Sequence, residues 1–175
     1  MPASRERVMF EGLVAGLLAY VVVAVVFAAA DLLLGRPLFA TPAIIGNLLF
    51  FGGRDAAPVV SAGPVAAANG VHVLLAVVLG LLAALLVEET ERHPQFFYVT
   101  FLVVVLFLFA STAVLLGMPS AVAKAAPWAV TLVANAAGLA VAGFYLWRSH
   151  PRLRSRLDEL SGGEEEPEPV ATPSR

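Results

Sequence analysis

Few side chains in this sequence could do chemistry, and the most notable of them lie inside long apolar stretches. His72 is the central candidate, and Asn69 lies one helical turn before it on the same face. Ionisable and amide side chains are costly inside a bilayer, so those found there are candidates for a binding site or a polar path. We predict a polar pocket in the outer half of the protein, formed by six side chains from four apolar segments: Asp31, Asn69, His72, Thr112, Thr131 and Asn135.

These polar residues also have a simpler interpretation. Hydrogen bonds between membrane helices contribute about 1 kcal/mol or less each, and the same side chains could serve only to hold the helices together. The two interpretations differ in what a substitution of His72 would do: a functional pocket predicts loss of activity with assembly intact, and a structural role predicts loss of both.

Other kinds of site are excluded by residue type or by spacing. The chain has no cysteine, which excludes disulfides and thiolate metal sites. A haem held by two histidines would need a second histidine at the depth of His72, and the sequence has none. His93 and His150 each precede a proline, but neither has neighbouring ligands at a metal-binding spacing. We therefore predict no metal site, no cofactor and no catalytic residue.

The elements that must position these side chains are helices that cross a membrane. Hydrophobic residues make up 59% of the chain and charged residues only 14%, a balance that ordinary soluble domains do not have. A span needs about 20 apolar residues, because lipid offers no hydrogen-bond partners to the backbone. We predict an all-α membrane four-helix bundle within residues 1–148, with spans over residues 10–34, 65–87, 96–118 and 125–147.

A cleaved signal peptide is the alternative interpretation of the first span. Arg5 and Arg7 give it a basic start, and the alanines at residues 28–30 resemble a small-residue cleavage site. The apolar run is longer than a usual signal core, however, and it continues through residues 32–34. Its length favours a span that is retained in the protein.

The distribution of arginine and lysine predicts the orientation, because positively charged flanks resist translocation. With the N-terminus inside, seven basic residues flank the spans on the inner side and three lie outside. Both termini are therefore expected in the cytoplasm, with the protein in a bacterial inner membrane. The inner residues are Arg5, Arg7, Arg92, Arg148, Arg152, Arg154 and Arg156, and the outer residues are Arg36, Arg54 and Lys124.

The long outer loop contains an apolar segment that is too short to cross. Thr41 and Pro42 form a helix start, since the hydroxyl can cap the first amides and proline suits the first helical position. Gly52 marks the end, so we predict a helix over residues 42–51, which is about 15 Å long, or half of a bilayer core. It could lie flat at the interface or dip in as a re-entrant helix, and Arg36 beside it favours the flat position.

The C-terminal part is polar and divides in two. Residues 149–160 are basic and are expected to lie on the inner membrane surface, and residues 161–175 form an acidic, proline-containing tail that we predict to be disordered. We expect four arginines to contact lipid headgroups: Arg148, Arg152, Arg154 and Arg156.

Three spans carry small residues at helical spacing, which allows helix backbones to approach closely. Such stripes could serve packing within one chain or dimerisation. They are Gly12 and Gly16, then Ala76, Gly80 and Ala84, and then Ala134, Gly138 and Ala142.

The segments DLLLGRPLFATPAIIG and NAAGLAVAGFYLWRSHP, together with a histidine near the outer end of the second span, resemble small uncharacterised bacterial four-span membrane proteins. The resemblance implies the architecture and no activity. The leading hypothesis is a non-enzymatic accessory, assembly or lipid-interacting protein that forms a homo-oligomer or joins a larger membrane complex, with no nucleic-acid partner. A small oligomeric transporter or channel with its path at His72 is the alternative. A membrane enzyme acting on a lipid or quinone lacks a visible second catalytic group.

Overall fold

The structure, a computed structural model, describes residues 5–52, 60–93, 95–118 and 120–151. Within these ranges all regular structure is helical. Four of the helices are long and apolar enough to cross a membrane, and one shorter helix, α2, is also apolar. The predicted all-α four-helix bundle with an extra short apolar helix is confirmed. The helices are α1 (Arg5–Leu33), α2 (Ala40–Phe50), α3 (Ala62–Arg92), α4 (Phe96–Leu116), α5 (Ser120–Ala125) and α6 (Trp128–Ser149).

The helix bounds differ from the predicted ones mainly where polar residues extend a helix beyond its apolar core. α3 continues to Arg92, whose Nη2 pairs with Glu88 Oε1 one turn away at 2.7 Å. α6 begins at Trp128, directly after Pro127, whose ψ of 139° is extended. The short helix α5 was not predicted, since its six residues carry no periodic pattern long enough to show.

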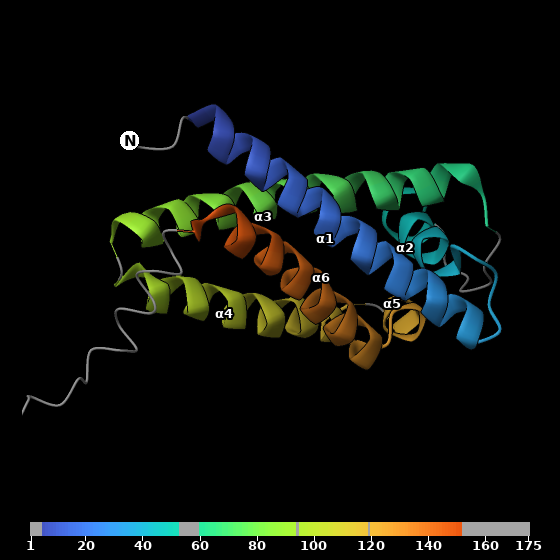
Figure 1. The fold of residues 1–175 in the computed structure, drawn as a ribbon. Helices are drawn as coiled ribbons and strands as arrows, with labels where there is room; N and C mark the ends of the chain where they lie inside the picture. The colour runs from blue at the N-terminus through green and yellow to red at the C-terminus, as the bar shows by residue number, and fades with distance from the viewer. Residues whose placement is uncertain (1–4, 53–59, 94, 119, 152–175) are drawn as a thin grey trace, which may run out of the picture.

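α1 is the central helix and packs against both α3 and α6 (Figure 1). The contact with α3 runs through glycines: a Cβ added to Gly12 would lie 2.7 Å from Leu81 Cα, and one added to Gly16 would lie 2.9 Å from Val77 Cα. Gly138 of α6 meets α1 in the same way, with Val23 Cγ2 only 3.0 Å from a Cβ built there. The small-residue stripes are therefore used for packing within the chain.

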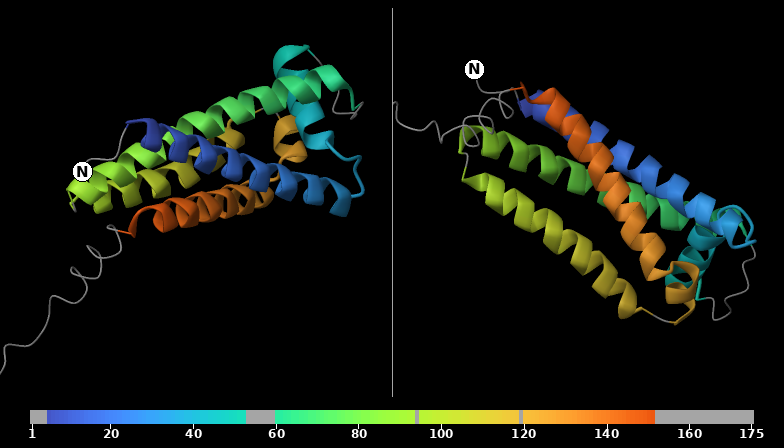
Figure 2. Two further views of the ribbon diagram at one scale, coloured as in Figure 1. Left: turned by 45° about the horizontal axis from the view of Figure 1, so that its top comes forward. Right: turned by 60° about the horizontal axis from the view of Figure 1, so that its bottom comes forward.

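α4 is the least packed of the long helices. It lies on the far side of α3 and α6 from α1 (Figure 2). Of its 21 residues, only Leu115 is buried. Its phenylalanine and valine side chains point outward, and Phe109 is 73% exposed.

The bundle has two ends, which we name after one residue at each. The His150 end holds the start of α1 and the ends of α3 and α6, and the Asp31 end holds the end of α1 together with α2 and α5. α2 and α5 are seen nearly end-on in Figure 1, whereas the long helices run across the view, so both short helices lie crosswise. α2 packs closely on α3, since a Cβ on Gly46 would overlap the backbone of Pro64.

Candidate functional site

A partly open cavity of about 150 Å³ lies between α1, α2 and α3, toward the Asp31 end. Its walls are mainly apolar, which suits an amphiphilic ligand better than a fully polar one. Three of the six predicted pocket residues line it. The lining residues are Tyr20, Ala24, Phe27, Ala28, Asp31, Phe39, Thr41, Pro42, Ala68, Asn69 and His72.

The polar wall of the cavity is formed by two side chains of α3 and one of α1. The hydroxyl of Tyr20 donates to Asn69 Oδ1 at 3.1 Å, and Asn69 Nδ2 donates to the carbonyl of Val65 at 2.9 Å. The Tyr20 and His72 rings meet edge to face, with centroids 5.4 Å apart. Within the described residues His72 makes this ring contact and no hydrogen bond, so its ring nitrogens can bind a ligand in the cavity. Sequence reasoning missed Tyr20, which faces His72 only because of how α1 crosses α3.

Asp31 also lines the cavity, but its carboxylate is engaged by its neighbours. It is fully buried, and Oδ1 lies 2.8 Å from Arg36 Nη2 and accepts from the Thr41 hydroxyl at 2.7 Å. Oδ2 accepts from the backbone amide of Thr41 at 2.9 Å. The structure therefore assigns Asp31 a structural role in holding the start of α2.

This arrangement corrects the predicted start of the short helix. Thr41 was expected to cap it, yet α2 already begins at Ala40, and the residue before it, Phe39, has a left-handed φ of 67° and no side-chain cap. The carboxylate of Asp31 satisfies an orphan amide of the first turn from ten residues upstream. Thr41 Oγ1 also lies 3.0 Å from the carbonyl of Ala125, which ties α2 to α5.

The other three predicted pocket residues do not line the cavity. Asn135 Nδ2 donates to Ser111 Oγ at 3.0 Å and so joins α6 to α4. The hydroxyl of Thr112 donates to the carbonyl of Leu108 in its own helix, at 3.0 Å. Thr131 Oγ1 is buried and has no hydrogen-bond partner in the part of the chain that the structure describes. These side chains have the depth that the sequence indicated but lie on other helix faces.

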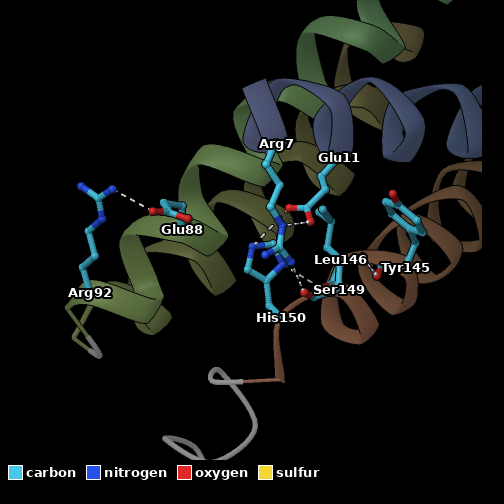
Figure 3. Close-up of polar contacts among 8 residues, drawn as sticks. All are labelled: Arg7, Glu11, Glu88, Arg92, Tyr145, Leu146, Ser149 and His150. Carbon is cyan, nitrogen blue, oxygen red and sulfur yellow. Dashed lines mark hydrogen bonds and ion pairs between the residues drawn. The ribbon is translucent and has the colours of Figure 1, made fainter. Parts of the chain in front are cut away.

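A second polar group, which sequence reasoning missed, lies at the His150 end (Figure 3). His150 follows α6 and is only 3% exposed, and its ring lies beside carboxylates of α1 and α3. Glu88, Glu91 and His150 each offer one ligand atom, and these atoms lie within 4.8 Å of one another. The sequence predicted no ligands near His150 because the acidic residues come from distant helices. The only feature of the sequence that indicates this group is the pair of acidic residues Glu88 and Glu91, one turn apart.

Glu11 belongs to the same end of the bundle. Its Oε1 accepts from Arg7 Nε at 2.8 Å, a partner one turn earlier on α1. Arg7 Nη2 donates in turn to the carbonyl of Ser149 at 2.9 Å, so α1 is joined to the end of α6. The second oxygen of Glu11, Oε2, faces His150 Nε2 at 3.4 Å.

Of the four arginines expected at lipid headgroups, Arg148 is in the last turn of α6 and is exposed. Arg152, Arg154 and Arg156 lie outside the described residues, as do almost all of residues 149–160 and the whole of residues 161–175.

No protein-family model matches the chain, and no curated protein or solved structure matches it either. The positions and contacts of the described residues are therefore the basis for a proposed function.

Proposed function

We propose that the chain is a multi-pass protein of a bacterial inner membrane and that it acts as a non-enzymatic subunit of a larger membrane assembly. Four long apolar helices support the membrane location. The start of α1 and the end of α6 lie at the same end of the bundle, joined by Arg7 and Ser149, and the excess of arginine there favours a cytoplasmic position for both termini.

The crosswise direction of α2 supports a position flat in the outer interface. One face of α2 is buried, with Gly46 against the start of α3, and the other face exposes Leu49 and Phe50, which are 53% and 51% exposed. A spin label placed by Leu38→Cys or Leu49→Cys, at the two ends of α2, tests this. A flat helix gives equal bilayer depths, and a re-entrant helix gives depths that differ by roughly 15 Å.

The main support for the subunit role is the exposed apolar face of α4. Two polar side chains of α4 point into the bundle: Thr100 Oγ1 lies 3.1 Å from Thr90 Oγ1, and Ser111 Oγ accepts from Asn135 Nδ2. Its aromatic and branched side chains point outward and are largely exposed. Since the small-residue stripes are already used inside the chain, α4 offers the broad apolar face on which another membrane helix can pack.

The experiment places a photo-crosslinking amino acid at Phe109 in cells. Leu74 of α3, which is 64% exposed, is the matched control on a different helix. We expect Phe109 to form an adduct with one defined membrane protein or with a second copy of the chain, and Leu74 to form adducts with lipid. Lipid adducts alone at both positions, with a single-chain mass in native mass spectrometry, would contradict the subunit role.

A small transporter or channel is the second candidate, and the cavity beside His72 favours it. The cavity is partly open and its polar wall has ring nitrogens that can bind a solute. Solute flux into liposomes that contain the purified protein tests this candidate. Flux should be lost in His72→Ala and kept in Asn135→Ala, because Asn135 bonds between α4 and α6 and does not line the cavity. Equal flux with and without protein would exclude it.

A further inference from the structure

The imidazole of His150 is held in one orientation by a contact with its own helix. Nδ1 lies 3.0 Å from the carbonyl of Leu146, and because a carbonyl can only accept, Nδ1 carries the proton and donates. Metal-binding histidines are commonly oriented by such a bond to a backbone carbonyl. The other nitrogen, Nε2, is buried and makes no hydrogen bond within the described residues.

Nε2 faces the second oxygen of the Glu11 carboxylate, which is also buried. Glu11 Oε2 makes no hydrogen bond to any residue that the structure describes, and it lies 3.4 Å from Nε2. Neither atom has a hydrogen-bond partner within the described residues, so both are available to bind a metal ion. Two ligand atoms bound to a tetrahedral zinc ion at about 2.0–2.1 Å lie roughly 3.3–3.4 Å apart. The observed separation suits a shared metal ion better than a direct hydrogen bond.

Further carboxylates approach from α3. Glu88 is 8% exposed and, with Glu91 and His150, forms the group whose ligand atoms lie within 4.8 Å of one another. Figure 3 shows the His150 ring between the carboxylates of Glu11 and Glu88. Arginine holds one oxygen of each of these two carboxylates, through Arg7 on Glu11 and Arg92 on Glu88, which fixes their direction.

We propose that the His150 end binds one divalent transition-metal ion of the zinc class. The ligands are His150 Nε2 and one carboxylate oxygen each of Glu88 and Glu91, with Glu11 Oε2 beside Nε2 at 3.4 Å. This is a nitrogen and oxygen set that suits such ions. The ion ties α1, α3 and the end of α6 together. This site is independent of the subunit role and of the cavity at the opposite end.

The test uses the full-length protein in detergent or nanodiscs, stripped with a chelator and then dialysed against Zn²⁺. We expect about one zinc ion per chain by elemental mass spectrometry. We also expect His150→Ala and Glu88→Gln to weaken zinc binding by more than about tenfold. Co²⁺ in place of Zn²⁺ should give the visible absorption of a low-coordinate site in the unmodified protein, and His150→Ala should abolish it.

His93→Ala is the matched control. His93 also precedes a proline and lies at the same end, but its side chain is 54% exposed and lies 3.6 Å from Glu89. It should bind zinc like the unmodified protein, and helix content should be equal in all variants. Absence of zinc in the unmodified protein would overturn the proposal. Full zinc binding in His150→Ala would overturn it too, by placing the metal elsewhere, for example on the acidic tail.

Discussion

At the scale of single residues, the structure distinguishes polar side chains that stabilise the fold from those that face the cavity. Asp31 and Asn135 were grouped with His72 because all three were expected at similar depth. Asp31 instead uses both of its oxygens on Thr41 and Arg36, and Asn135 is bonded to Ser111. Depth along a helix follows from residue number, whereas the face that a side chain presents to another helix depends on the packing.

Asp31→Ala should destabilise the protein by about 3 kcal/mol, because it leaves the Arg36 guanidinium without its buried partner and removes the acceptor of the Thr41 amide. Unfolding in mixed micelles measures the loss. Asp31→Asn keeps an acceptor oxygen for the amide and should lose less. Equal stability of the alanine variant and the unmodified protein would contradict the role assigned to Asp31.

At the scale of helices, the close approach of α1 and α3 depends on glycine. Gly80 lies against the backbone of Gly12 and Gly16, so the stripe on α3 fits the stripe on α1 without intervening side chains. The sequence predicted that small residues would form a contact. Whether the contact lay within one chain or between two chains was decided by the order of the helices in the bundle.

Gly80→Val should therefore separate α1 from α3 and lower stability by roughly 3 kcal/mol, toward the upper end for overpacking in a core. Gly143→Val is the matched control, since a Cβ at Gly143 has nothing within 4 Å. Thermal unfolding of the two variants in the same detergent measures the difference. If both variants melted at the same temperature, the proposed close contact would not be important for stability.

At the scale of the whole molecule, three of the long helices pack closely together and the fourth, α4, packs loosely. α1, α3 and α6 form the packed part, with the cavity toward one end and the His150 group at the other. α4 adds a mainly apolar outer face of which little is buried. The orientation of the whole molecule in the membrane is a prediction from its flanking arginines, and it can be tested apart from any function.

Since the chain has no natural cysteine, single cysteines can report the topology. Gln95→Cys, between α3 and α4, should react with a membrane-impermeant thiol reagent only after the inner side is opened. Val60→Cys, before α3, should react from outside in intact cells, because Val60 is exposed near the Asp31 end. The reverse labelling pattern would show that the protein has the opposite orientation.

The sequence by itself determined the class of this protein, because four runs of about 20 apolar residues and the lack of hydrogen-bond partners in lipid leave helices as the only fit. The ion pair of Arg7 and Glu11 is also encoded locally, because the two residues lie one helical turn apart. Only the tertiary structure placed Tyr20 against His72, Asp31 at the start of α2, and Glu11 beside His150. These contacts join segments that are far apart in the sequence, in most cases different helices. Their geometry depends on the way in which α1 crosses α3 and α6. The spacing of residues along a single segment does not encode that crossing.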